Sequence, residues 1–163
     1  MQLYEKYVTE TVDENTGRLT KIDFHIPDDF NFGFDVVDFW GKNTPDKTAL
    51  LWVGEHHEEK TFTFSDMMRL TNKTANYFRS LGIKKGDRVM LILRRHYQFW
   101  FSIVALHKIG AIVIPATDQL MKKDLVYRFN LAGVSAVVIS STGSIVDEAE
   151  KAFEQCDVKT KIL

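Results

Sequence analysis

The sequence predicts an α/β fold, a parallel sheet flanked by helices on both faces and preceded by an N-terminal arm and a β-hairpin. Three short apolar runs carry this prediction: Arg88–Leu93, Ala111–Ile114 and Ala136–Ile139. Each run is almost wholly apolar, as expected of a strand whose two faces are both covered. Segments of helical length separate the runs, and this alternation is typical of parallel strand–helix–strand units.

The composition is that of one globular domain. The chain has 163 residues, 45% hydrophobic and 26% charged, which excludes the disordered and low-complexity classes. A net charge of -1 leaves no excess of basic residues for nucleic acid, so we expect no such partner. Cys156 is the single cysteine, no signal-peptide pattern follows Met1, and the longest apolar stretch lies near Phe99–Leu106. Because a bilayer span needs ~20 apolar residues, we expect no membrane span and a cytoplasmic location.

The first third of the chain is less regular. Residues 1–34 are mixed and polar, and we expect an extended N-terminal arm with a short helix near its start. The α/β subdomain is expected over residues 35–163, beginning with a short helix at Asp35–Lys42, which has an apolar stripe. Ala49–Val53 and Thr61–Phe64 flank a polar turn, so the pair is expected to form the β-hairpin.

From residue 65 onward, helices and strands are expected to alternate strictly. Ser65 is the expected N-cap of the first long helix, and Gly82 its C-terminal glycine. The chain ends on an apolar segment that we expect to start a further strand, and this ending indicates a fragment. The remaining helices are expected at Tyr97–Ile109, Lys122–Leu131 and Ser144–Phe153, and the last strand at Lys161–Leu163.

Polar segments follow the predicted strands, at the edge where α/β proteins usually bind ligands. Arg94–His96 is either a solvated basic loop or part of such a site. In Pro115–Leu120, a hydroxyl and an amide precede a helix that carries Arg128, and this set could bind a nucleotide or a pantetheine-like ligand. Alternatively, Thr117, Asp118 or Gln119 caps that helix.

Two glycine-containing segments could hold phosphate. Ser140–Ser144 follows a strand and opens a helix, but it lacks the second glycine and the lysine of a phosphate loop. We therefore expect an ordinary strand-to-helix turn there. Gly82–Asp87 is either a basic anion-binding loop or a helix cap followed by a turn with its lysines in water.

Other reactive side chains are not expected to form sites. Adjacent ligands at His56–Glu59 rarely converge on one ion, so a solvated hairpin tip is expected. Cys156 has no partner cysteine, and His107 lies on a mostly apolar helix where packing is expected. We assign no metal-binding residue.

A set of segments resembles the N-terminal region of the adenylate-forming acyl-CoA synthetases. Two of them, near residue 30 and after residue 115, are similar to the medium-chain branch, and the whole set covers about residues 27–140. The segments are Pro27–Asp38, Phe62–Phe64, Ala75–Phe78, Leu81–Val89, Ala105–Pro115 and Ala116–Arg128.

The resemblance implies a two-step reaction. A carboxylate attacks the α-phosphate of MgATP to give an acyl-adenylate and pyrophosphate, and coenzyme A then displaces AMP. ATP, Mg and coenzyme A are thus the implied cofactors, and a carboxylic acid is the implied partner. The family's loop ending in Gly-x-Pro-Lys is absent from this sequence. We therefore assign no catalytic residue and expect the isolated chain to be inactive.

The resemblance also carries two binding residues and one departure. Gln119 matches a position that contacts coenzyme A in medium-chain relatives, and Arg128 is a weaker candidate. Arg94 stands where relatives usually carry Pro, which puts the shape of that loop in question.

Two alternatives stay open from the sequence. The chain could be a stand-alone module that binds a nucleotide or coenzyme A without turnover, or a non-catalytic interaction domain. If part of a larger domain is missing, exposed apolar patches and self-association are expected.

Overall fold

The computed structural model describes residues 2–141, 143–158 and 160–162. The chain divides into two compact units, Met1–Asn31 and Phe32–Leu163, which are described separately.

The first unit contains a hairpin that the sequence analysis missed. The one-turn helix η1 (Leu3–Lys6) matches the helix expected near the start. Strands β1 (Val8–Val12) and β2 (Leu19–Phe24) then pair antiparallel within the segment expected to be an extended arm. The Asp13 carboxylate closes their turn by accepting hydrogen bonds from the backbone N–H groups of Asn15 and Thr16. This turn chemistry was visible in the sequence, but the weak apolar alternation of the strands hid the hairpin.

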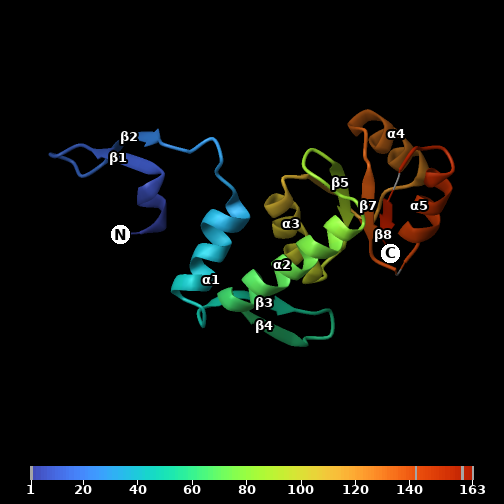
Figure 1. The fold of residues 1–163 in the computed structure, drawn as a ribbon, viewed down its shortest axis with the longest axis horizontal. Helices are drawn as coiled ribbons and strands as arrows, with labels where there is room; N and C mark the ends of the chain where they lie inside the picture. The colour runs from blue at the N-terminus through green and yellow to red at the C-terminus, as the bar shows by residue number, and fades with distance from the viewer. Residues whose placement is uncertain (1, 142, 159, 163) are drawn as a thin grey trace. The chain divides into compact units, whose positions relative to one another are not determined.

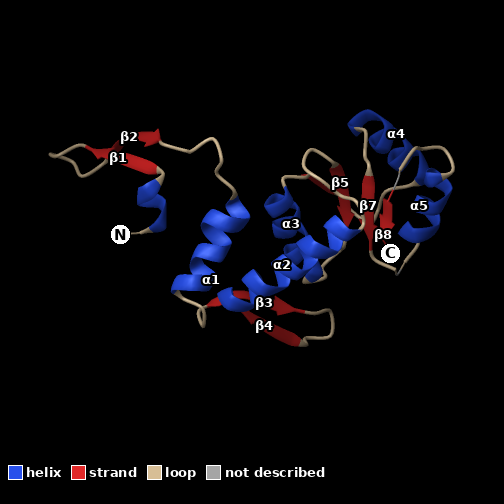
Figure 2. Ribbon diagram, in the orientation of Figure 1, coloured by secondary structure: helices blue, strands red, loops and turns tan. Residues whose placement is uncertain are grey.

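The second unit contains the predicted alternation (Figures 1 and 2). Its elements follow in chain order: η2 (Phe32–Asp38), α1 (Phe39–Asn43), β3 (Thr48–Val53), β4 (Glu59–Thr63), α2 (Phe64–Ser80), β5 (Arg88–Ile92), α3 (Gln98–Ile109), β6 (Ile112–Pro115), α4 (Lys122–Ala132), β7 (Ala136–Ile139), α5 (Ile145–Phe153) and β8 (Thr160–Ile162).

The main sheet has four parallel strands in the order β6-β5-β7-β8. Side chains of β5 point alternately to its two faces, because successive residues of a strand face opposite sides. Met90 and Ile92 join a core with α4 and α5, whereas Val89 and Leu91 join a second core with α2 and α3. The predicted α/β fold with helices on both faces is confirmed.

A third apolar cluster lies beyond α2 and α3, where the β3–β4 hairpin and η2 pack. Phe62 of the hairpin contacts Phe101 of α3 edge to face, with ring centroids 5.1 Å apart. Val37 of η2 and Met67 of α2 are buried in the same cluster. The predicted hairpin is therefore part of this unit's packing. The short helix expected at Asp35–Lys42 is a π-helical turn, η2, that continues into α1.

A buried ion pair joins η2 to α3. The Lys108 ammonium lies 2.6 Å from Asp38 Oδ1 and donates a second hydrogen bond to Asn72 Oδ1 of α2, at 2.7 Å. The Lys108 side chain is 1% exposed and that of Asp38 is 8% exposed. Burial lowers the pKa of Lys108, and the hydrogen bond to Asp38 opposes that shift. One lysine thus ties three elements together in a place closed to water.

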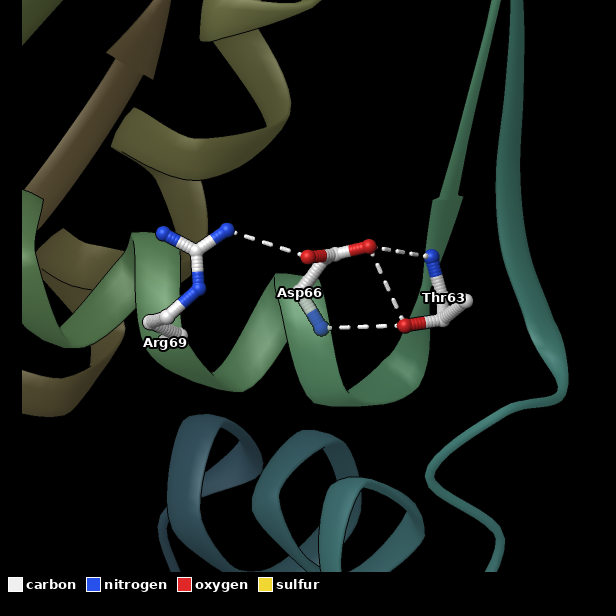
Figure 3. A network of polar contacts seen from close by, with 3 residues as sticks. All are labelled: Thr63, Asp66 and Arg69. Carbon is white, nitrogen blue, oxygen red and sulfur yellow. Dashed lines mark hydrogen bonds and ion pairs between the residues drawn. The ribbon is translucent and has the colours of Figure 1, made fainter.

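Helix α2 begins two residues earlier than the sequence analysis expected. Thr63 is the N-cap residue in place of Ser65, and its hydroxyl accepts a hydrogen bond from the Asp66 backbone N–H at 3.1 Å (Figure 3). Asp66 returns the contact by accepting from the Thr63 backbone N–H at 3.2 Å, and it pairs with Arg69 at 3.0 Å. This reciprocal capping box satisfies two helix-end donors, whereas Ser65 as N-cap would leave them open.

No helix within the part of the chain that the structure describes has both the length and the apolar character needed to cross a bilayer.

Replacing Lys108 by Met should destabilise the chain by about 3–5 kcal/mol, because the buried Asp38 carboxylate loses its partner. The Lys108→Met/Asp38→Leu double variant should recover most of that loss, since no buried charge remains. Lys73→Met, on the exposed side of α2, is the control and should change little. Urea unfolding measures all three, and a single variant within about 1 kcal/mol of the parent contradicts the role of the pair.

The Asp66 carboxylate should make the stability of the folded chain depend on pH in acid. The hydrogen bond from Arg69, followed by that from the Thr63 backbone, holds the pKa of Asp66 below its ordinary 3.8. Its stabilising contribution is therefore complete above the unfolded-state pKa and is lost as pH falls through the lower folded-state pKa. The unfolding midpoint of the parent should exceed that of Asp66→Asn at pH 7, and the gap should close as the pH falls below 3.8, the ordinary pKa of the group.

The matched control for that experiment is Asp46→Asn, which removes a carboxylate from an exposed loop. Its gap from the parent should stay small at both pH values. An Asp66 gap that does not depend on pH would rule out the charge of the capping box as the cause.

Candidate functional site

The topology selects one place on the sheet for a site. Strands β5 and β7 are neighbours, yet the helix that follows β5 covers one face and the helix that follows β7 covers the other. Ligands of open α/β sheets usually bind at the carboxyl ends of the strands beside such a switch point.

A hydrogen bond spans this switch point. His96, in the loop after β5, lies 3.2 Å from the Ser140 hydroxyl, measured from Nε2 to Oγ. Ser140 directly follows β7 and is only 7% exposed, and its backbone N–H donates to the Ile92 carbonyl at 3.0 Å. The first residue of the Ser140–Ser144 segment is therefore part of the sheet edge.

An ion pair joins the same loop to the strand on the other side of β5. Arg94 Nε lies 2.8 Å from Asp118 Oδ2, in the loop after β6. Both side chains are partly exposed, 48% for Arg94 and 30% for Asp118, so the pair contributes position more than stability. Arg94–His96 was expected to be either a solvated basic loop or part of a ligand site. In the structure, the side chains of Arg94 and His96 contact residues that follow the neighbouring strands β6 and β7.

Arg94 has a left-handed backbone, with φ of 39°. Proline is locked near −65° and cannot adopt this conformation. The proline that the resemblance implies at this position could therefore not adopt the backbone that Arg94 has here.

The β3–β4 hairpin holds the other side of this loop, which we call the Arg94 loop (residues 93–97). The Trp52 indole N–H donates to the Arg95 carbonyl at 2.6 Å. The Lys60 ammonium lies 3.3 Å from the Tyr97 hydroxyl and 4.6 Å from the centre of its ring. Trp52 and Lys60 were not predicted as site residues, because no local sequence pattern links the hairpin to a loop about 40 residues later.

The two predicted coenzyme A residues lie just before α4 and within it, and whether they bind coenzyme A stays a prediction. Gln119 is exposed in the loop before α4, and its backbone N–H donates to Thr117 Oγ1 at 3.3 Å. Arg128 is exposed further along α4, about 9 Å of helical rise from Lys122. Within the described residues, neither side chain makes a hydrogen bond or ion pair, so both face solvent.

The capping alternative for this loop is wrong. The N-cap residue of α4 is Met121, and its backbone N–H donates to the Asp124 carboxylate at 3.2 Å. Thr117, Asp118 and Gln119 lie before that point. The loop is instead held by the ion pair from Asp118 to Arg94.

A carboxylate already occupies the start of α4. Glu148 of α5 accepts a hydrogen bond from the Lys122 backbone N–H at 2.7 Å, and this bond, followed by one from Lys151, lowers the pKa of Glu148. In the neighbouring Ser140–Ser144 segment, Thr142 lies outside the described residues. Gly143 is left-handed, and Ser144 precedes α5 without a side-chain capping bond. A phosphate beside Glu148 would meet a negative charge, which agrees with the expected ordinary turn.

The remaining candidates are separate from this edge. In the β3–β4 turn, Glu58 accepts a hydrogen bond from the His56 backbone N–H. His107 is packed, as predicted, with its ring edge to face against Phe32, and burial lowers its pKa. Burial raises the pKa of the half-buried Cys156 thiol, so it is a poor nucleophile.

Comparison with known proteins defines the class. Residues 37–163 match the AMP-binding enzyme family, and the chain belongs to that family. The chain is 36% identical to mouse mitochondrial acyl-coenzyme A synthetase ACSM1 over 149 residues, which are 86% of this chain and 26% of that protein. It is also 36% identical to rat mitochondrial acyl-coenzyme A synthetase ACSM5 over 121 residues, 71% of this chain and 21% of that protein.

The chain thus spans about a quarter of the length of these relatives. The resemblance to acyl-CoA synthetases is confirmed. The expected cytoplasmic location is contradicted, because these relatives are named as mitochondrial proteins.

Solved structures share the fold. An acyl-CoA synthetase from Brucella canis superposes with a TM-score of 0.72 at 23% identity, covering 82% of this chain and 24% of that one. A fatty acyl CoA synthetase from Mycobacterium tuberculosis gives 0.71 at 22% identity, covering 81% and 26%.

The left-handed backbone of Arg94 should be measurable as strain. Arg94→Gly and Arg94→Ala both lose the ion pair with Asp118, but only Ala must hold a positive φ. We expect the Gly variant to be more stable by about 1 kcal/mol in urea unfolding.

The same two substitutions at Arg95 are the control. Its φ is not positive, so the order should reverse, with Ala at least as stable as Gly. The same order at both positions would contradict strain at Arg94.

Proposed function

We propose that this chain forms the first α/β part of the large domain of an AMP-forming acyl-CoA synthetase. The observation that carries the proposal is the family match over residues 37–163 together with acyl-CoA synthetase relatives at 36% identity. The parent reaction is then acid-thiol ligation through an acyl-adenylate, with ATP, Mg and coenzyme A. The segments near residue 30 and after residue 115 support a medium-chain carboxylic acid as substrate. The names of the relatives favour a mitochondrial site of action.

Within that enzyme, the described residues form part of the scaffold and do not supply the groups that act on ATP. Adenylation needs groups that hold the phosphates of ATP, and the sequence contains no Gly-x-Pro-Lys. At the start of α4, a carboxylate occupies the place that an anion would take. We infer that residues 1–34 act as an N-terminal arm and residues 35–163 as a scaffold that does not form an adenylate alone.

The contribution of this chain to binding is proposed to lie at Gln119, with Arg128 as a secondary contact for coenzyme A. Three features support this. Both side chains are exposed, the loop of Gln119 is fixed by Asp118 and Thr117, and the site follows the carboxyl end of β6. Coenzyme A is long enough to reach both residues although they do not touch.

A second candidate is a stand-alone module that binds coenzyme A without turnover. This candidate is favoured because the contacts that hold the Gln119 loop and the neighbouring Arg94 loop are all made by residues of this chain. Self-association also stays a prediction, supported by exposed apolar side chains such as Tyr127 and Leu131 of α4.

Reading the coding sequence past the Leu163 codon tests the synthetase proposal. We expect it to continue into a Ser/Thr/Gly-rich loop that ends in Gly-x-Pro-Lys. A stop codon directly after Leu163 would overturn the catalytic proposal for this gene product.

Two assays on the 163-residue chain then separate the candidates. With MgATP and octanoate, the scaffold proposal expects no ATP–pyrophosphate exchange, and exchange would overturn the inactivity of the chain. In calorimetry with coenzyme A, the scaffold proposal expects no micromolar binding. Micromolar binding that Gln119→Ala abolishes and Asn130→Ala preserves would support the binding module instead.

A further inference from the structure

The edge of the sheet opposite the candidate site carries a hollow of about 490 Å³. It lies among the end of α2, the loop that leads into β5 and the end of α3. The loop before β5 meets the end of α3 where the Gly86 backbone N–H donates a hydrogen bond to the Gly110 carbonyl at 2.9 Å. The lining residues are Arg79, Gly82, Ile83, Lys84, Lys85, Lys108 and Ile109.

Four of the seven lining residues are basic, and none is acidic. The ammonium of Lys108 is bound to Asp38, so its charge is compensated. The other three, Arg79, Lys84 and Lys85, are exposed, and no ion pair involves them among the described residues. Several cations around one concave surface concentrate positive potential inside it.

The backbone caps part of each neighbouring helix end. The last carbonyls of α2 accept hydrogen bonds from the backbone N–H groups of Leu81, Gly82 and Ile83. Those of α3 accept from Gly110 and Ala111. These capped carbonyl groups need no basic side chain, and within the described residues none of Arg79, Lys84 and Lys85 donates a side-chain hydrogen bond.

The shape of the hollow places one lysine. A Cβ added at Gly110 would come within 3.0 Å of Lys85 Cγ, so the Lys85 stem lies directly against that glycine. Ile83 is 3% exposed and gives an apolar floor. The Asp87 carboxylate is turned to the Lys84 backbone N–H at 2.8 Å, within the loop.

We propose that this hollow binds a small phosphate-bearing anion through Arg79, Lys84 and Lys85. Its volume is within the range of small-molecule sites, about 300–1,000 Å³. Guanidinium and ammonium groups are the side chains that recognise phosphate oxygens. Most backbone N–H groups of the loop are already bonded, so the side chains carry the binding, and it should weaken with added salt. The site is distinct from the coenzyme A contacts proposed at the other edge.

The test is a titration of the 163-residue chain with inorganic pyrophosphate, without metal, followed by amide NMR shifts and calorimetry. We expect saturable shifts centred on Ile83–Asp87 rather than on Thr117–Gln119. Lys84→Gln/Lys85→Gln should weaken binding at least tenfold at low salt, with Arg79→Gln as an independent third variant. The control Lys73→Gln/Lys123→Gln removes two exposed charges elsewhere and should change affinity less than twofold.

Three results would overturn the proposal: no saturable binding at millimolar pyrophosphate, an equal loss in the two double variants, or shifts spread over every exposed lysine. A fourth such result is an acidic peptide that binds at Ile83–Asp87 of a chain that does not bind pyrophosphate, which would favour a protein partner. Because the NMR shifts are measured at Ile83–Asp87, none of these results depends on synthetase activity or on Gln119.

Discussion

Every strand of the main sheet runs in the same direction, and this constraint shapes the second unit. Each connection between parallel strands must cross the sheet, so each strand is followed by a helix on one of its faces. The alternate side chains of β5 separate cleanly into two cores, Met90 and Ile92 on one face and Val89 and Leu91 on the other. The two middle strands, β5 and β7, are almost wholly apolar because both of their faces are covered.

The same constraint gathers three loops at one edge of the sheet. All parallel strands end at one edge, and there the Arg94 loop, the Asp118 loop and Ser140 meet side by side. The β3–β4 hairpin completes the arrangement by holding the Arg95 carbonyl through Trp52. A loop held from three sides needs little ordering when it meets a ligand, which is how rigid scaffolds make surface loops useful.

The opposite edge shows what the buried Lys108 contributes. Its ammonium is directed to Asp38 and Asn72, which fixes η2 against α2 and α3. The ion pair that joins η2 to α3 thus lies beside a hollow whose remaining cations make no ion pair among the described residues. Membership of the AMP-binding enzyme family explains the scaffold, whereas the charge of this hollow is a property of the described residues themselves.

Apolar periodicity and short motifs are local, so they were enough to predict the alternation of helices and strands after residue 65, the burial of the central strands on both faces and the family. Prediction from the sequence failed where two weak strands in the segment before residue 31 paired, and where Thr63 rather than Ser65 capped α2. The strand order β6-β5-β7-β8 could not be predicted from local patterns, and neither could the contacts of Arg94 with Asp118 and of His96 with Ser140 that depend on it. Those partners are far apart in the chain, and their distance depends on which strands become neighbours, a choice made by the packing of the whole sheet.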